Sequence, residues 1–240
     1  RLPQWPGEEL ILCGLAGLGA FVGWEMKTRS PVLNVNLFRQ NRIFALSNLA
    51  ALVHYSATFG VGFLLSLYLQ FVKGFSPSHA GSVLLCQPVM QALCSPFAGR
   101  LSDRLEPRIV ASVGMGLSVL GLLLLVLAGD QTGVAYIIAC LVLLGLGFGL
   151  FSSPNTNAAM SSVDKKFYGV ASGTVATMRL LGQMLSMGLA SLLFALYIGR
   201  VQITPEFYPA FLKTMRIAFG IFASLCTAGI FASLARGRVR

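Results

Sequence analysis

The sequence predicts an all-α integral membrane protein. Three observations support this prediction: the composition, the length of the apolar runs and the placement of the charges. The chain has 240 residues, of which 55% are hydrophobic and 11% charged, and its mean hydropathy is +0.76. A soluble domain carries about 25% charged residues and could not bury so much apolar surface at this length. The composition therefore excludes a cytosolic enzyme, a disordered protein and a disulfide scaffold.

Seven apolar runs are assigned as membrane spans, since a spanning helix needs ~20 mostly apolar residues. These runs are residues 10–24, 43–72, 80–97, 109–129, 134–153, 170–198 and 217–235. The first run is the shortest, and the sixth contains one formal charge, Arg179. Pro88 predicts a kink in the third run, because a proline leaves the carbonyl four residues earlier without its helical partner.

Three Gly-x3-Gly pairs predict places where helix backbones approach closely. They begin at Gly19, Gly145 and Gly169. This spacing is common in membrane bundles, so it indicates tight packing and carries no information about a substrate.

The charges give the orientation. The chain has 18 Lys and Arg residues against 8 Asp and Glu, a net charge of +10. The basic residues favour one set of alternate loops over the other by 12 to 5. Because cytoplasmic loops are enriched in Lys and Arg, we expect a cytoplasmic C-terminus, an outward N-terminal end and a lipid bilayer as the surroundings. No basic helix or aromatic platform accompanies the charge, so we expect no nucleic-acid partner.

The stretch from Gly99 to Arg108, Gly-Arg-Leu-Ser-Asp-Arg-Leu-Glu-Pro-Arg, is the most informative motif. We expect a short cytoplasmic turn here, with Gly99 allowing a tight exit from the third span. Asp103 would accept from N–H groups at the start of the next helix or pair with an arginine. Arg100, Arg104 and Arg108 would hold the loop inside and bridge to neighbouring helix ends. Two interpretations stay open: an ordinary positive-inside loop, or a latch that holds a moving bundle in one conformation.

The order Gly99-x-Leu101-x-Asp103-Arg104, closing at Arg108, resembles the inter-helix loop signature of the major facilitator superfamily. Further stretches are similar to its fourteen-span drug:proton antiporter branch, the EmrB/QacA type. They are residues 29–39, 145–158, 169–173 and 179–183. The resemblance implies an extra transmembrane helix running from outside to inside at residues 1–25 and a cytoplasmic linker at 26–42. It also implies a six-helix C-terminal transporter half, made of two inverted three-helix repeats, at 43–235, and a cytoplasmic tail at 236–240.

The sequence also departs from this family. Glu106 stands where the loop signature usually has glycine, and Pro107 where it usually has a basic residue, which puts the turn geometry in doubt. The antiporter signature and the proton-coupling acids of that branch lie in the N-terminal half, and no Asp or Glu lies inside any apolar run here. We therefore expect a C-terminal part of a longer transporter, with the missing N-terminal half as a required partner.

Arg179 is the leading candidate for a functional residue. It lies nine residues, or ~14 Å, into its span if the helix begins near Val170. That depth is close to the bilayer midplane, where an arginine costs ~2.5–3.5 kcal/mol. Ser172, Gln183 and Ser186 fall within about 60° of it on a helical wheel, which predicts a polar stripe lining a cavity. Arg179 could hold a helix junction, attract an anionic group or tune a proton-carrying acid in the other half.

Other cavity candidates lie in the second and third spans. Asn48 and Tyr55 share a face, and His54, about 100° away, lies near the midplane. A histidine there can carry a proton or be a neutral packing residue. Gln87 and Gln91, one turn apart beside the proline, can hydrogen-bond a substrate or bond across helices.

The favoured function is secondary active transport by alternating access. The resemblance implies export of a small amphipathic drug or metabolite against inward-flowing protons, with the proton gradient as energy source, no cofactor and no metal. It also implies a bacterial inner membrane. An intramembrane enzyme is disfavoured, because the sequence has no H-E-x-x-H, no paired intramembrane acids and only two histidines. A truncated half without transport, and a receptor-like or structural seven-span protein, remain as alternatives.

Overall fold

The computed structural model describes residues 16–17, 19–20, 23–24, 35–199 and 205–237. Most of the predicted first span and of the predicted linker therefore lies outside the described residues, as does the end of the predicted tail. The part of the chain that is described contains helices and no strand, as the predicted all-α class requires.

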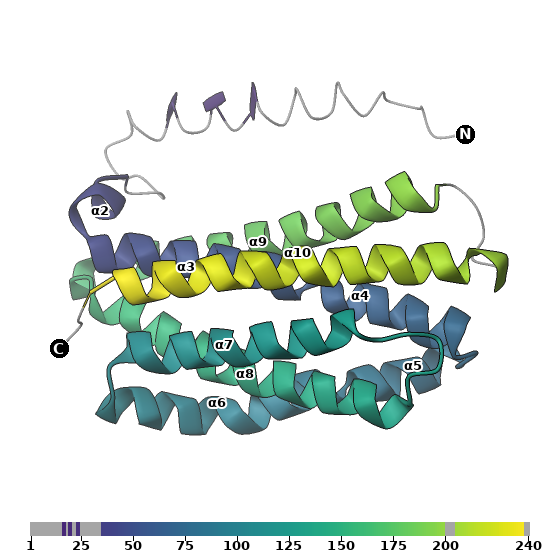
Figure 1. Ribbon diagram of the computed structural model, residues 1–240. Helices are drawn as coiled ribbons and strands as arrows, with labels where there is room; N and C mark the ends of the chain where they lie inside the picture. Colours follow the sequence, from purple (N-terminus) through teal and green to yellow (C-terminus); the bar gives the residue numbers. More distant parts are fainter. Residues whose placement is uncertain (1–15, 18, 21–22, 25–34, 200–204, 238–240) are drawn as a thin grey trace.

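The helices from residue 35 onward lie side by side along a common direction (Figure 1). Their bounds are α2 Val35–Gln40, α3 Arg42–Thr58, α4 Gly60–Leu67, α5 Pro77–Leu84, α6 Cys86–Arg104, α7 Pro107–Val126, α8 Val134–Ser161, α9 Tyr168–Tyr197 and α10 Tyr208–Ala235. A π-helical turn, Tyr68–Val72, follows α4, and 3₁₀ turns at Lys165–Phe167 and Pro205–Phe207 precede α9 and α10.

Five helical stretches of the described residues are long and apolar enough to cross a membrane: Arg42–Val72, Pro107–Val126, Val134–Ser161, Lys165–Tyr197 and Tyr208–Ala235. They match the predicted second, fourth, fifth, sixth and seventh spans. The predicted third span is divided between α5 and α6, and neither helix is both long and apolar enough to count among these five stretches. The reason is physical, since the helix is interrupted and α6 carries two glutamines and a charged last turn.

Several helices extend beyond the apolar run that predicted them. The predicted fifth span ends at residue 153, whereas α8 continues to Ser161 through Pro154. The predicted seventh span begins at residue 217, whereas α10 begins at Tyr208. Hydropathy marks the hydrocarbon core, and a helix can continue past it wherever its backbone hydrogen bonds remain intact.

The predicted kink at Pro88 stays a prediction, but a boundary between two helices lies close to it. The helix is interrupted at Leu85, between α5 and α6, next to the carbonyl of Leu84, which the proline leaves without its usual partner. A second interruption, at Phe59 between α3 and α4, has no proline within the helix to announce it.

The helices pack around α8 and α10. Helix α8 contacts α6 and α7, and helix α10 contacts α7 and α3. Helix α9 contacts α3. Phe151, Phe219, Phe222 and Met115 are completely buried in the core between them. This arrangement leaves α6 and α9 on the two sides of α3 and α8, where the cavity described below is found.

The predicted Gly-x3-Gly faces differ in outcome. A Cβ on Gly145 would lie 2.5 Å from the carbonyl oxygen of Gln87, and one on Gly149 would lie 2.9 Å from the Cβ of Cys94. This pair therefore lets α8 approach α6 closely, as predicted. The pairs that begin at Gly19 and Gly169 are not at close contacts, because a Cβ there would meet nothing within 4 Å in the described structure.

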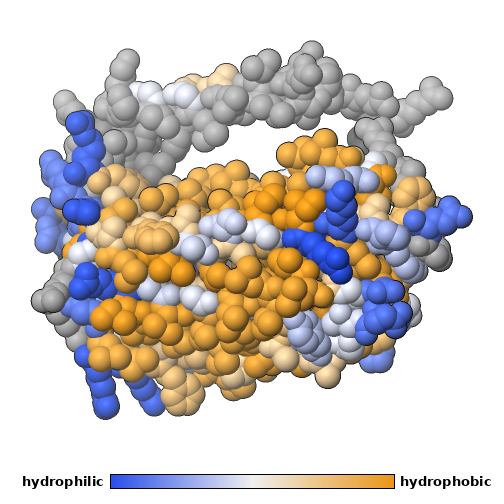
Figure 2. Space-filling model, viewed as in Figure 1, coloured by the Kyte–Doolittle hydropathy of each residue, from blue (hydrophilic) through white to orange (hydrophobic). Residues whose placement is uncertain are grey.

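The two ends of the bundle are hydrophilic, and an apolar belt separates them (Figure 2). One end collects α2, the α6–α7 and α8–α9 connections and the end of α10 (Figure 1). These segments carry the more basic set of loops, so the alternation of charge along the sequence corresponds to two opposite ends of the fold.

The structure corrects the expected loop from Gly99 to Arg108. The α6 helix continues to Arg104, and Leu105 and Glu106 alone connect it to α7. Gly99 is therefore inside a helix and does not form its exit. The N-cap position of α7 is Glu106, which makes no side-chain cap hydrogen bond, and Pro107 opens α7. The proline suits the first helical position because no intrahelical partner exists there for an N–H.

Candidate functional site

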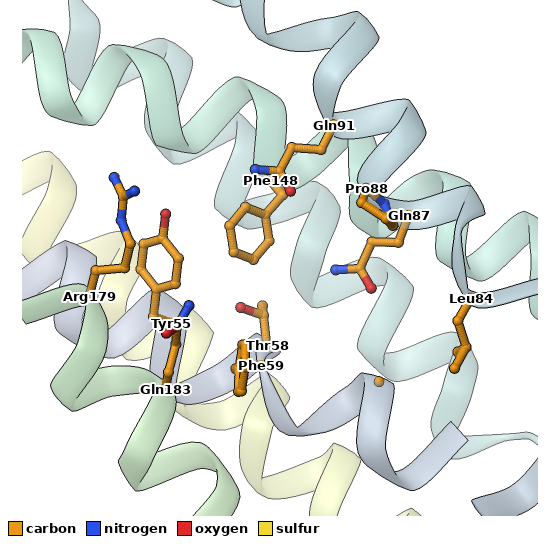
Figure 3. A pocket seen from close by; sticks show the side chains of 11 residues that line it. Tyr55, Thr58, Phe59, Leu84, Gln87, Pro88, Gln91, Phe148, Arg179 and Gln183 are labelled. Carbon is orange, nitrogen blue, oxygen red and sulfur yellow. The ribbon is translucent and has the colours of Figure 1, made fainter. Parts of the chain in front are cut away.

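A cavity of about 410 Å³ lies between α3, α4, α6, α8 and α9 (Figure 3). Its lining combines aromatic, amide and cationic side chains and includes no aspartate or glutamate. The lining residues are Tyr55, Thr58, Phe59, Gly62, Leu84, Gln87, Pro88, Gln91, Phe148, Arg179 and Gln183. Five of the residues predicted from sequence, drawn from three separate spans, thus meet in one place.

Both helix interruptions border this cavity, through Phe59 on one side and Leu84 on the other. At Phe59 and Leu85 the backbone keeps right-handed helical dihedrals, and the two N–H groups still bond to the carbonyls of Tyr55 and Gly81. Beside Phe59, the N–H of Gly60 donates to the Oγ of Ser186 on α9, at 2.8 Å. A side chain of α9 therefore holds the backbone at the edge of the cavity.

Arg179 lies beside Tyr55 at one side of the cavity (Figure 3). It is the twelfth residue of α9, about 17 Å from the start of the helix. The guanidinium carbon lies 5.2 Å from the centroid of the Tyr55 ring, a cation–π distance. The Nε atom of Arg179 is buried and has no hydrogen-bond partner among the described residues. The ring face of Tyr55 attracts the charge but does not satisfy this N–H.

Gly182 sets the position of Arg179 against α3. A Cβ at Gly182 would lie 2.6 Å from the carbonyl oxygen of Leu52 and 2.8 Å from the Cβ of Tyr55. Only glycine allows α9 to approach α3 this closely. The close approach places the turn that carries Arg179 and Gln183 directly beside the Tyr55 ring.

An aromatic wall closes the cavity toward the core. Tyr55 and Phe148 meet edge to face, with ring centroids 5.1 Å apart, and the Tyr55 hydroxyl lies 3.4 Å from the Oγ of Ser152. His54 lies behind this wall, with its ring 4.9 Å from that of Phe148 and 4.0 Å from that of Phe151.

Gln87 and Gln91 extend from α6 on the opposite side of the cavity, toward Phe148 (Figure 3). The close approach of α6 and α8 at Gly145 and Gly149 fixes the turn that carries them. Each amide offers two donors and one acceptor, so the site presents neutral hydrogen-bonding groups on α6 and a cation on α9.

The other four predicted residues lie elsewhere. Ser186 is fully buried and accepts the Gly60 hydrogen bond, whereas Ser172 is exposed outside the cavity. Asn48 is buried toward one end of α3, donates to the carbonyl of Phe44 at 2.9 Å and has an unpartnered Oδ1. His54 is fully buried; its Nδ1 lies 3.6 Å from the Sγ of Cys226, and its Nε2 has no partner. The helical wheel did not separate these residues from the cavity lining, because it shows which residues share a helix face but not which neighbouring helices cover that face.

The comparison with known proteins decides the family. Residues 47–239 match the model of the Major Facilitator Superfamily. The chain belongs to this superfamily. It is 30% identical over 206 residues to the riboflavin transporter RibZ of Clostridioides difficile, which covers 86% of this chain and 45% of RibZ.

Two further relatives of this superfamily member show the same coverage pattern. The methyl viologen resistance protein SmvA of Salmonella typhimurium is 30% identical over 218 residues, covering 91% of this chain and 43% of SmvA. The multidrug resistance protein Stp of Mycobacterium tuberculosis is 29% identical over 190 residues, covering 79% of this chain and 35% of Stp. The chain thus spans less than half the length of these curated relatives.

The residues of the loop signature, Gly99 to Arg108, lie next to the end of α8. Gly99 and Ser102 contact it most directly: a Cβ on Gly99 would lie 3.1 Å from the Oγ of Ser153, and the Ser102 hydroxyl accepts from the Nδ2 of Asn157 at 3.1 Å. Arg100, Asp103 and Arg104 are exposed on the last turns of α6. Arg108, at the start of α7, has a buried Nε without a hydrogen-bond partner.

Outside the cavity, the role of Arg236 was also missed by sequence reasoning. Arg236 was assigned to the cytoplasmic tail, yet its side chain is 1% exposed. Its Nη1 donates to the Oδ1 of Asn155 at 2.8 Å and to the Oγ of Ser47 at 3.3 Å, and Asn155 in turn donates to the carbonyl of Ser47 at 3.1 Å. Arg236 therefore ties the ends of α3, α8 and α10 together.

The charge of Arg236 persists in this buried position. Burial lowers the pKa of its guanidinium to about 10; Arg108 adds to the shift and Glu106 opposes it. The group is thus protonated at neutral pH. Its Nε and Nη2 are buried and have no hydrogen-bond partner among the residues that the structure describes.

Among the described residues, no group of three or more His, Cys, Asp or Glu side chains could hold a metal ion. The polar and aromatic groups of the cavity lining are a guanidinium, amides, two hydroxyls and aromatic rings.

Proposed function

We propose that this chain forms one half of a secondary active transporter that exports a small amphipathic drug or metabolite in exchange for protons. The observation that carries the proposal is the cavity bordered by two helix interruptions and lined by polar groups from α6 and α9. Substrate sites of secondary transporters lie near the bilayer midplane, at the interface between repeats, and are often built from discontinuous helices. A second six-helix half, packed across the cavity, would complete the site.

The names of the relatives support the substrate class. RibZ is named for riboflavin, SmvA for methyl viologen and Stp for multidrug resistance, and two of these names specify flat ring compounds. The aromatic wall of Tyr55 and Phe148 suits a planar substrate, since rings pack edge to face or offset. Membership of the fourteen-span drug:proton antiporter branch and a bacterial inner-membrane location belong to the same proposal.

Proton exchange is tested in inverted membrane vesicles that contain the protein of which this chain is part. The vesicles are acidified by respiration and followed with a pH-sensitive dye. Addition of a transported compound should release protons and restore the dye fluorescence, and riboflavin, methyl viologen and 2-naphthoate are the panel.

The double variant Gln87→Ala, Gln91→Ala should lower this response, because it removes the amides that face the cavity. Ser224→Ala is the matched control, since that exposed hydroxyl bonds to a carbonyl of its own helix. An unchanged response in the glutamine variant would place the substrate site elsewhere. No dye response to any panel compound would contradict proton-coupled export of this class.

We also propose that the α6–α7 connection, with Gly99, Arg100, Asp103, Arg104 and Arg108, holds the transporter in one conformation. The proposal is supported by the exposed charges on α6 and their short, two-residue connection to α7. Asp103→Asn should lower the maximal transport rate with little change in the concentration for half-maximal transport, because the side chain is outside the cavity. Equal rates in the variant and the parent would leave this segment as an ordinary positive-inside loop.

A further inference from the structure

The cavity has an uneven distribution of charge that bears on what it binds. Its lining contains one cation, Arg179, and no carboxylate. The described α-helices hold no Asp or Glu except Asp103, in the last turn of α6 at one end of the bundle. A cationic ligand would therefore meet repulsion in this half of the site and find no counter-charge there.

The hydrogen-bonding state of Arg179 points to an acceptor. Within the part of the chain that the structure describes, its Nε is buried without a hydrogen-bond partner, and its guanidinium lies over the face of the Tyr55 ring, which engages the charge. Hydrogen bonds from a guanidinium to a carboxylate or phosphate are short, often paired and about twice as strong as neutral ones. A carboxylate or phosphate, with two anionic oxygens, would thus satisfy the free donor of the Arg179 guanidinium.

The surroundings of Arg179 add a second requirement. Tyr55 and Phe148 form an aromatic wall next to the cation, and the amides of Gln87 and Gln91 extend toward that wall from across the cavity (Figure 3). A ligand whose acidic group reaches Arg179 therefore lays its body against the rings and within reach of the amides. A ring compound with an acidic substituent meets all of these contacts.

Resting on the transport function proposed above, we propose that the substrate is an aromatic compound carrying a carboxylate or phosphate, and that Arg179 is the residue that selects for the acidic group. Gln87 and Gln91 bind its neutral polar groups. This proposal implies that the site binds flat cations weakly, whereas the relative SmvA is named for methyl viologen, a cationic ring compound.

The test compares 2-naphthoate with 2-naphthamide, which share a ring and differ in charge. Equilibrium dialysis with the purified protein in nanodiscs gives the affinity for each, and the vesicle assay gives transport. We expect the parent protein to prefer the carboxylate by about tenfold, the ratio that one charge-assisted hydrogen bond supplies. Arg179→Gln should remove the preference by weakening naphthoate alone, and Arg179→Lys should retain part of it.

Two more variants make the test specific. Arg179→Glu should favour 2-naphthylmethylammonium over 2-naphthoate, a gain that loss of folding cannot produce. Lys213→Gln, which removes an exposed cation of α10 outside the cavity, should keep the parental preference. Melting midpoints of all variants identify any that fail to assemble.

The outcomes separate the two proposals. If the parent protein transports panel compounds but binds the two naphthalene probes equally, selection by Arg179 is wrong and transport stands. The same holds if Arg179→Gln and Arg179→Glu weaken both probes to the same extent, as they would if Arg179 pairs with a carboxylate of the other half. If the parent protein neither binds nor moves any probe, the transport function falls and this inference falls with it.

Discussion

Arg179 and Arg236 each bring a guanidinium into the bundle, one beside the cavity and one at the end of α10. Arg179 was predicted to face a cavity because it is the one formal charge inside an apolar run, and it lines the cavity. Arg236 was assigned to a solvated tail because it follows the last apolar run, yet it folds back and is buried against Asn155 and Ser47. Hydropathy gives the position of a residue along the helix axis, but a long side chain can reach back by a full turn.

Truncation of Arg236 should destabilise the bundle. Arg236→Ala leaves the Oδ1 of Asn155 without its donor and opens a void, which we expect to cost about 1–3 kcal/mol and to lower the melting midpoint in detergent. Arg39→Ala, which removes an exposed arginine of α2, is the control and should melt like the parent. Equal midpoints for the two variants would show that the contact contributes no stability.

The loss in Arg236→Ala should be the same at pH 6 and pH 8. The folded pKa of Arg236, about 10, lies below the ordinary value of 12.5, so the group is protonated in both the folded and unfolded chain at either pH. Only between these two values does the unfolded chain bind the extra proton, and there stability rises with pH. A difference between pH 6 and pH 8 would assign the effect to another group.

Ser186 separates a structural role from a cavity role. Ser186→Ala removes the acceptor for the Gly60 N–H and should lower the melting midpoint, at about 1–2 kcal/mol for a buried donor left unsatisfied. The half-saturating substrate concentration should not change, because this side chain is outside the cavity. A raised half-saturating concentration without loss of stability would restore Ser186 to the substrate site.

At the scale of helices, local sequence rules succeeded where one residue determines the geometry. A helix boundary lies at Leu85, close to Pro88, and Gly145 and Gly149 gave the close α6–α8 contact. The interruption at Phe59 has no such marker, since the Gly60 N–H is satisfied by a serine 126 residues away. The predicted end of the helix at Gly99 was wrong, since α6 continues to Arg104. A charged turn can stay helical outside the hydrocarbon core.

The α6–α8 contact should tolerate no side chain at Gly145. A Cβ there would lie 2.5 Å from a backbone oxygen and 2.8 Å from the Cβ of Met90, so Gly145→Ala should cost about 1–3 kcal/mol by overpacking. Gly116→Ala is the matched control within α7, where a Cβ meets nothing within 4 Å. Its melting midpoint should be unchanged or slightly higher, since alanine favours the helix. Similar losses in both variants would contradict the close-contact explanation.

For the whole molecule, the pattern of apolar runs and charges predicted the class and the two ends of the bundle. It also predicted part of the cavity: Tyr55, Gln87, Gln91, Arg179 and Gln183 meet there. Thr58, Phe59 and Phe148 were missed, because aromatic and hydroxyl side chains are common on every face of a membrane helix. Which face lines the cavity is decided by packing between segments far apart in the sequence.

The orientation in the membrane can be tested with introduced cysteines. In a variant without native cysteines, Asp130→Cys in the α7–α8 connection should react with a membrane-impermeant thiol reagent added to intact cells. Asp164→Cys in the α8–α9 connection should react only after permeabilisation, because the end with more basic residues is retained in the cytoplasm. Both positions are exposed. The reverse labelling pattern would invert the predicted topology.

The bond between the Gly60 N–H and Ser186 has a mechanical consequence. It fastens α9 to the chain at the point where α3 gives way to α4, one turn beyond Gly182 on the same helix. The helix α9, which carries Arg179, is therefore hydrogen-bonded to the junction between α3 and α4. We therefore expect a ligand that displaces α9 to displace the junction between α3 and α4 as well, through this hydrogen bond.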